Sequence, residues 1–232
     1  MQLIELATAM FLAGAGPIEA PRMCSPEYTP TAEVVDETLF WLYLRADKVD
    51  KFPIRTFVKN PKAKDKSKGH WVTVGWRDAP YGSKDSEAAD RLGMGLKEYE
   101  VGGAKTEFKL RVYCHTAAAI AAGHQVVVTS LFRDDYRQRI AEGIKSADNA
   151  SFHGGSKRGG YGNGVAVDLS VNGSWSEKEA FWKWSDAHRE YGLVRVYGSG
   201  DPPHFVPSDG QEIRTASRHK HKKIKKVRVA KR

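Results

Sequence analysis

The heptapeptide Val165–Val171 (VAVDLSV) alternates strictly, and it constrains the fold more than any other pattern in the chain. In an extended strand its four aliphatic residues project to one face, while Ala166, Asp168 and Ser170 project to the other. A strand of this kind must bury its aliphatic face against another layer of structure. The carboxylate of Asp168 is then expected in mid-strand on the opposite face, where it is either solvated, paired with an arginine or bound to a metal.

Helical and extended patterns surround this strand without regular βαβ alternation, which indicates an α+β fold. Before it, the sequence predicts helices at Glu33–Ala46 and Asp134–Glu142, strands at His70–Trp76 and Gln125–Ser130, and a loop over 78–86. A further helix, ending at Gly123, is predicted from a stripe of Leu110, Tyr113, Cys114, Ala117 and Ala121.

After the alternating strand, Ser176 and Glu179 match a capping box for a helix that runs to Tyr191. Its expected buried stripe is Ala180, Trp184, Ala187 and Tyr191. A strand at Leu193–Tyr197 and a Gly/Pro loop follow, and then the segment His204-Phe205-Val206.

The net charge of +9 is confined to the C-terminal tail. Residues 214–232 hold ten Lys or Arg and no acidic residue, so the rest of the chain has 27 basic and 28 acidic groups. Nucleic-acid binding is therefore not favoured for the body, which also has no recognised nucleic-acid motif. The tail is expected to be disordered and either simply solvated or an electrostatic tether to an anionic polymer or surface.

Two sequence features bear on whether the protein is exported from the cytoplasm, and each allows two interpretations. Residues 1–16 are apolar, as in a secretory signal peptide, but Glu5 interrupts them and no basic residue precedes them, so a packed helix explains them equally well. Cys24 and Cys114 could form one disulfide, although ninety residues of separation give no geometry from which to derive it. No apolar run reaches the length of a membrane span.

Two histidines lie near Asp168 in suggestive contexts. His153 ends a Ser-Phe-His segment before a glycine-rich loop, and His204 follows Asp201-Pro202-Pro203. A single histidine is more often an ordinary surface or core residue than a ligand. Two imidazoles and one carboxylate, however, suit tetrahedral zinc with an open fourth position. A carboxylate that is not a ligand is then needed as the base, and Asp201 is placed for that role.

The ordered motifs resemble those of the zinc D-alanyl-D-alanine carboxypeptidase and L-alanyl-D-glutamate endopeptidase family. Its Ser-x-His and Gly-x-Ala-x-Asp motifs are similar to Ser151–His153 and Gly164–Asp168, and its acidic-x-x-His motif to Asp201–His204. A strand ending in Ser, then x-aromatic-Arg and a later Gln, is similar to Ser130–Arg133 with Gln138.

The resemblance implies a Hedgehog/DD-peptidase-like fold, in which a small, mostly antiparallel sheet flanked by helices carries zinc on one face. By this resemblance His153, Asp168 and His204 would bind Zn²⁺, and Asp201 would be general base and then proton donor. Arg133 would hold the oxyanion or a substrate carboxylate, unless it forms an ordinary surface ion pair. Ser151 and Gln138 would be supporting residues.

The family also implies a substrate and a compartment. The expected activity is hydrolysis of a peptide bond in peptidoglycan, in the periplasm or outside the cell. The alternative is a catalytically inactive cell-wall-binding module on the same fold. The expected organisation is an apolar segment over 1–24, an N-terminal region of unknown role over 25–105, a catalytic core over 106–212 and a basic tail over 213–232.

The chain departs from the family pattern at two places. Fourteen residues separate His153 from Asp168, more than in the family's compact motif, and the extra glycine-rich segment 154–163 either lines the substrate cleft or is inert. Asp201 stands where the carboxypeptidases usually carry Glu, which leaves the cleaved bond open.

Overall fold

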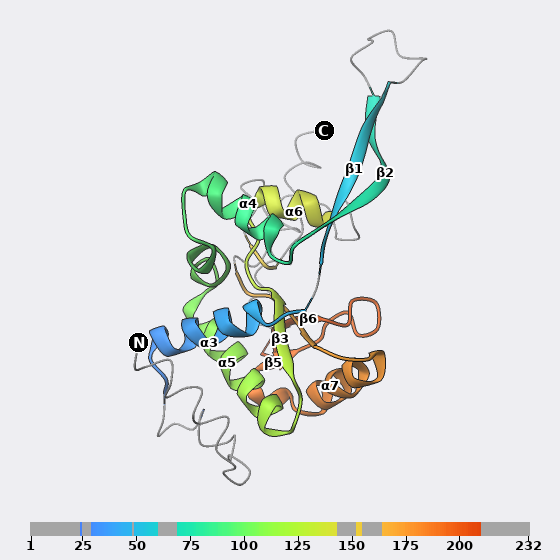
Figure 1. The fold of residues 1–232 in the computed structure, drawn as a ribbon. Coiled ribbons are helices and arrows are strands. Elements are labelled where there is room, and N and C mark those ends of the chain that lie inside the picture. The colour runs from blue at the N-terminus through green and yellow to red at the C-terminus, as the bar shows by residue number, and fades with distance from the viewer. Residues whose placement is uncertain are drawn as a thin grey trace, which may run out of the picture.

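The computed structural model describes residues 24, 29–47, 49–59, 69–142, 152–154 and 164–209. Over these residues the protein is α+β, as expected, with a four-stranded antiparallel sheet, a separate two-stranded hairpin and surrounding helices (Figure 1). Within the described part, no helix is long and apolar enough to cross a membrane.

The four-stranded sheet has the order β3-β4-β6-β5, and every pairing in it is antiparallel. Its strands are β3 (Val126–Ser130), β4 (Val167–Val171), β5 (Leu193–Val194) and β6 (His204–Pro207). The predicted aliphatic face of β4 is buried, but Ala166 and Ser170 on its other face are buried too, so β4 is a central strand enclosed on both sides. The strand predicted to continue to Tyr197 ends at Val194, and the side chain of the next residue, Arg195, forms an ion pair with Asp186.

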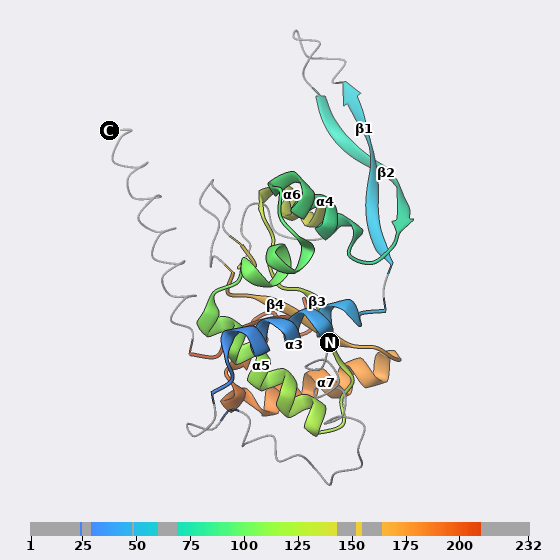
Figure 2. The same cartoon turned by 60° about the vertical axis from the view of Figure 1, so that its left-hand side comes forward.

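Helices α3 (Ala32–Leu44), α5 (Thr106–Ala121) and α7 (Trp175–Ala187) contact this sheet (Figure 2). Apolar residues of all three helices and of the strands form one hydrophobic cluster, so the region before residue 105 contributes to the same core as the region after it. On α5 the buried side includes Phe108, Val112 and Ala119, whereas Ala121 of the predicted stripe is exposed. The helix nevertheless ends where expected, with Gly123 at a φ of 93°.

The start of α7 corrects the predicted capping box. The sequence SWSEKE holds two overlapping Ser-x-x-Glu boxes, and the helix uses Ser174 with Glu177, not Ser176 with Glu179. The predicted stripe was wrong at Ala180 and Ala187, which are exposed, and it omitted the buried Phe181 and Trp182; its Trp184 does pack, half-buried, against the core. Large aromatic side chains outweigh alanine in area removed from water. The helix stops at Ala187, and a short 3-10 turn, η2 (Arg189–Tyr191), follows.

The loop predicted over 78–86 is wrong at both ends. Strand β2 (Gly69–Ala79) continues into it, and helix α4 (Ser83–Leu92) begins within it, after a turn in which Gly82 has a φ of 81°. Helix α4 is held by a tertiary contact, because its Asp85 forms a fully buried ion pair with Arg137 of α6 (Asp135–Glu142). Local composition cannot reveal such a contact.

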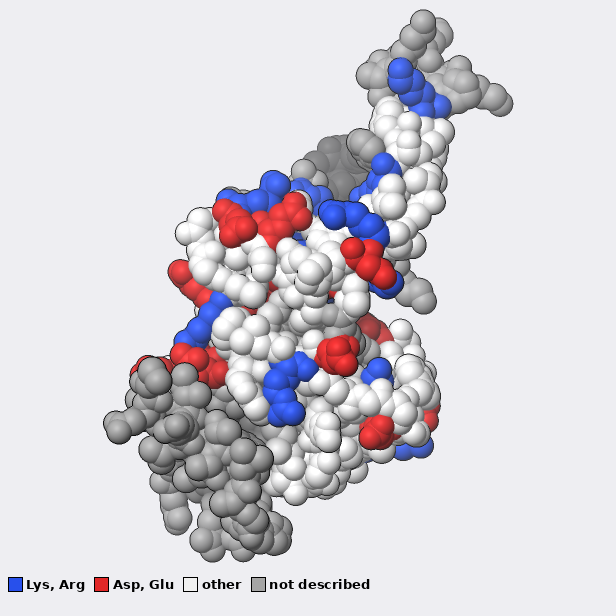
Figure 3. Space-filling model, viewed as in Figure 1, with Lys and Arg blue, Asp and Glu red and all other residues white. Residues whose placement is uncertain are grey.

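Strand β1 (Asp50–Lys59), which was not predicted, pairs with β2 in a hairpin that extends away from the body (Figures 1 and 2). Figure 3 shows Lys and Arg along this hairpin, acidic side chains where it joins the body, and both signs of charge interspersed over the body on the face shown. Residues 60–68 between the two strands, residues 1–23 of the predicted apolar segment and the basic tail lie outside the described residues.

A disulfide joins Cys24 to Cys114 on α5. The sequence left open whether these two cysteines pair, and the structure shows that they do. The bond fixes the chain just before α3 to the longest helix of the core.

Candidate metal centre

Strand register places Asp168 and His204 side by side. The two residues are direct partners in the antiparallel pairing of β4 with β6, and Ser130 of β3 is the partner of Asp168 on its other side. Residues directly opposite one another in an antiparallel pair project to the same face of the sheet. The alternation that the sequence shows around Asp168 thus brings its carboxylate and the His204 imidazole to one point.

His153 reaches the same point from outside the sheet. The Val165 backbone N–H donates to the Phe152 carbonyl over 2.9 Å, which fixes the segment carrying His153 to the start of β4. The Nδ1 atom of His153 lies 3.1 Å from the carbonyl oxygen of Leu131, just after β3. Because a carbonyl can only accept, Nδ1 carries the proton, and Nε2 of the neutral ring carries the lone pair.

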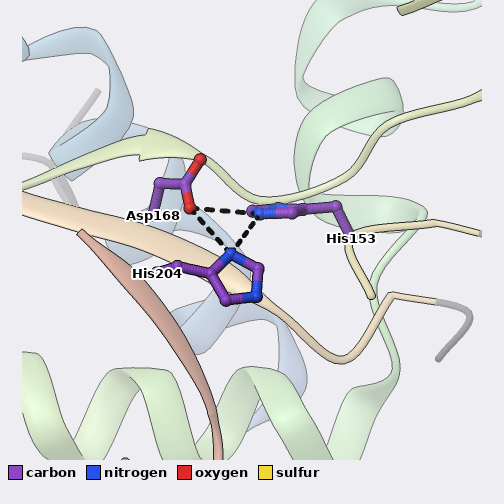
Figure 4. Close-up of side chains that lie close together, drawn as sticks. All are labelled: His153, Asp168 and His204. Atoms are coloured by element: carbon purple, nitrogen blue, oxygen red, sulfur yellow. Dashed lines mark hydrogen bonds and ion pairs between the residues drawn. The ribbon is translucent and has the colours of Figure 1, made fainter. Parts of the chain in front are cut away.

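The three side chains form a small, nearly equilateral triangle (Figure 4). Its edges are 3.1 Å from His153 Nε2 to Asp168 Oδ1, 3.2 Å from His153 Nε2 to His204 Nδ1, and 3.2 Å from His204 Nδ1 to Asp168 Oδ1. His153 and His204 are buried, and Asp168 is nearly so. The predicted ligand set therefore converges.

The triangle fits a cation better than it fits a hydrogen-bond network. With Nδ1 of His153 protonated toward Leu131, a neutral His153 cannot donate from Nε2, so its edge with the ionised Asp168 would bring two acceptors together. In tetrahedral zinc sites, bonds of about 2.0–2.1 Å place neighbouring ligand atoms about 3.3–3.4 Å apart, close to the edges observed. Two imidazole nitrogens and one carboxylate oxygen are also a donor set that Zn²⁺ accepts.

Electrostatics keep these groups in metal-binding form. Burial, and then the charge of Arg133, lower the pKa of His153 to about 4, so its ring is neutral at physiological pH. Burial by itself would raise the pKa of Asp168, but positive charge beside it, that of His153 when protonated and that of Arg133 throughout, holds the pKa well below its usual range. Asp168 is therefore ionised, with Oδ1 turned to the two histidines.

Arg133 contacts Asp168 Oδ2, the carboxylate oxygen that does not face the two histidines. Its guanidinium forms an ion pair with Asp168 Oδ2, and its Nε donates to Ser130 Oγ over 2.9 Å. Both partners of the ion pair are largely buried, so this is not an ordinary surface pair. The sequence left open whether Asp168 would be solvated, paired with an arginine or bound to a metal, and the structure shows the pairing with an arginine. The role of Arg133 toward an oxyanion or substrate carboxylate stays a prediction.

Asp201 lies on the exposed turn that leads into β6, three residues before His204. The His204 backbone N–H donates to the Asp201 carbonyl over 3.2 Å. Partial desolvation, and then the charge of Asp168, raise the pKa of the Asp201 carboxyl above its usual value. A raised pKa makes a carboxylate a better proton acceptor near neutrality.

The remaining predicted residues have separate outcomes. Gln138 is buried on α6, where its backbone N–H donates to Asp134. Ser151 and residues 155–163 of the glycine-rich segment lie outside the described residues. Sequence reasoning missed the contribution of the Leu131 carbonyl, because a backbone acceptor has no residue signature. It also missed the Tyr197 ring, whose centroid lies 5.2 Å from that of His204.

Comparison with known proteins found no matching family model, no matching curated protein and no matching solved structure. Any assignment therefore depends on the site itself and on the motif resemblance.

Proposed function

We propose that the protein is a zinc metallopeptidase that hydrolyses a peptide bond in peptidoglycan stem peptides. The bond would be of the D-Ala-D-Ala carboxypeptidase type or the L-Ala-D-Glu endopeptidase type. The observation that carries the proposal is the convergence of His153, Asp168 and His204 on one point, in the motif order of the zinc peptidases that the sequence resembles. A Hedgehog/DD-peptidase-like fold is part of this proposal, supported by the antiparallel sheet that positions two of the three ligands.

The residues divide the chemistry among them. When bound, zinc would supply Lewis acidity, which polarises a peptide carbonyl and lowers the pKa of water toward neutrality. The Asp201 carboxylate would accept the proton as water oxygen attacks the carbonyl carbon, and would return it to nitrogen as the C–N bond breaks. Arg133 would keep Asp168 ionised and oriented through Oδ2. His153 would be kept in the correct tautomer by the Leu131 carbonyl.

The disulfide supports an extracytoplasmic location, as proposed for an enzyme that acts on the cell wall. Disulfides persist in the periplasm and outside the cell, and they are rare in the reducing cytosol. The Cys24–Cys114 bond is therefore consistent with a periplasmic or extracellular protein. The basic residues of the tail would add attraction to anionic wall polymers.

Metal analysis combined with digestion of purified peptidoglycan tests the proposal. We expect one zinc per chain, and released fragments whose masses identify the cleaved bond. His204→Ala should lose both the metal and the activity, whereas His70→Ala, at an exposed position of the hairpin, should lose neither.

The possible outcomes separate the two functions considered. Zinc binding and wall binding without any released fragment would favour the inactive wall-binding module. Failure of the wild-type protein to bind zinc, with folding intact, would reject the metallopeptidase.

A further inference from the structure

A buried acidic residue outside the ligand triangle is hydrogen-bonded to the segment that positions two of the ligands. Glu100 lies in η1 (Glu98–Gly102), a five-residue π-helical turn, and its side chain is fully enclosed, with 0% exposure. Its Oε2 accepts the backbone N–H of Leu131 over 3.1 Å. Its Oε1 is also buried and has no hydrogen-bond partner among the described residues.

Leu131 is the residue whose carbonyl orients His153. Its N–H is bound by Glu100 and its C=O accepts from His153 Nδ1, so the two hydrogen bonds fix this residue from opposite directions. Without the first bond, the backbone just after β3 would lose its restraint from η1 at this residue. The carbonyl that sets the His153 tautomer and ring orientation would then be free to shift.

The same short segment also holds Asp168. Ser130 Oγ accepts from Arg133 Nε, and Arg133 in turn is ion-paired with Asp168 Oδ2. Residues 130–133 therefore supply the partners of His153 and Asp168, two of the three candidate ligands. Glu100 accepts its hydrogen bond from Leu131, which lies within this segment.

Neighbours of Glu100 strengthen this attachment. The Tyr99 hydroxyl donates to Asp134 Oδ1 over 3.0 Å and accepts the Asp134 N–H over 3.2 Å. The Tyr99 ring meets Phe132 edge-on with centroids 5.5 Å apart, and Phe132 lies so close to Gly103 that a Cβ there would be 2.3 Å from its ring. η1 and the residue after it thus hold the segment 130–134 by hydrogen bonds and by packing.

A buried carboxyl at this position lowers the stability of the folded state unless it does more than fill space. Fully buried acids are rare unless paired, and the ion pairs among the described residues do not include Glu100. Burial, and then the charge of nearby Asp85, raise its pKa well above the usual range. An apolar side chain of similar size would avoid this cost, but it could not accept the Leu131 N–H.

We propose that Glu100 is a positioning residue of the metal centre, which holds Leu131 so that His153 and, through Arg133, Asp168 keep metal-binding geometry. The inference rests on the proposed metal site. Glu100 acts as a hydrogen-bond acceptor and not through a negative charge, so a neutral amide of the same shape performs the same task.

Zinc affinity of Glu100→Ala and Glu100→Gln tests this role against a matched control. Asp50 is also a buried carboxylate that accepts a backbone N–H, that of Lys84, but it lies at the base of the hairpin. Glu100→Ala and Asp50→Ala should both lower the thermal midpoint. Only Glu100→Ala should weaken zinc binding, by about 10-fold, the lower end of the range for residues that support ligands. Glu100→Gln should lose much less zinc affinity than this, because the amide oxygen still accepts the Leu131 N–H.

Two results would overturn the proposal. One is a Glu100→Ala protein that binds zinc as tightly as Asp50→Ala. The other is a Glu100→Gln protein that is as weak as Glu100→Ala, which would make charge, and not hydrogen-bond acceptance, the operative property.

A metal-free measurement separates this inference from the proposed function. In the apo protein, NMR should show faster exchange of the Leu131 amide and altered His153 ring nitrogen signals in Glu100→Ala but not in Asp50→Ala. If the wild type binds no zinc, the proposed function fails, and these signals still decide the role of Glu100. Unchanged Leu131 and His153 signals in Glu100→Ala would refute it.

Discussion

Gly154 should be indispensable to the metal centre, because there is no room for a side chain beside His153. A Cβ at residue 154 would lie 1.8 Å from the Arg133 carbonyl oxygen and 2.8 Å from the Arg133 carbonyl carbon. Both atoms are backbone, so no side-chain rotation relieves the clash. To reach ordinary van der Waals contact the two segments must separate by about 2 Å.

That displacement exceeds what the ligand triangle tolerates. Metal–ligand distances are held to about ±0.2 Å, and the two segments that must separate carry His153 and Arg133. We therefore expect Gly154→Ala to weaken zinc binding by at least about 10-fold to 100-fold, as the loss of ligand support does elsewhere. Overpacking should also cost about 1–3 kcal/mol of stability.

A competition titration against a fluorescent zinc chelator measures the effect, with circular dichroism to confirm folding. Gly95→Ala is the matched control, since a Cβ there meets nothing within 4 Å and its φ is not positive. A folded Gly154→Ala protein that binds zinc as tightly as Gly95→Ala would show that the 1.8 Å approach does not constrain the ligands.

Four further outcomes are expected. Burial, with a smaller effect of His188, holds the pKa of His115 at about 4. As pH falls below about 6.5, His115 becomes protonated in the unfolded state but stays neutral in the folded state, which favours unfolding. Between pH 7 and 5 the free energy of unfolding should therefore drop by about 2 kcal/mol more in wild type than in His115→Gln. Parallel denaturant titrations check this; equal losses in the two proteins would refute it. Asp201→Ala should retain zinc and lose about 10²–10⁴-fold in peptide turnover, whereas loss of its zinc would make Asp201 a ligand. Deleting residues 214–232 should leave turnover of a small soluble peptide unchanged and weaken retention on purified walls at low salt; salt-independent retention would count against a tether. Chelation should abolish hydrolysis and leave the far-ultraviolet circular dichroism intact, because the large hydrophobic core does not include the ligands.

The candidate ligand set could be predicted from the sequence, because its signals are local. The alternation around Asp168 fixes which face its carboxylate takes, and short motifs surround His153 and His204. Glu100 could not be found in this way. Its importance comes from one hydrogen bond to a residue 31 positions away, and nothing in its own neighbourhood marks it. Helix α4 was missed for a similar reason, since its buried Asp85 is satisfied by residues far along the chain, Arg137 of α6 and Tyr43 of α3. Local patterns predict elements and motifs, whereas these contacts depend on the tertiary arrangement.

The long interval between His153 and Asp168 is compatible with the site because the structure anchors both of its ends. At the first end, the His153 ring is bonded to the Leu131 carbonyl and Gly154 is pressed against Arg133. At the second end, the Gly164 carbonyl accepts the Lys105 N–H over 3.0 Å, and Gly164 has a φ of 74° with no room for a side chain. The two anchors are then joined by the Val165–Phe152 hydrogen bond. The geometry of the ligands is thus set by contacts at the edges of the interval and not by its length. Lengthening a loop between fixed ends adds little closure entropy, about 0.6 kcal/mol for each doubling. The departure from the compact family spacing is therefore no argument against the metal centre. Substitutions at the two anchoring glycines should matter far more than changes in the number of residues between them.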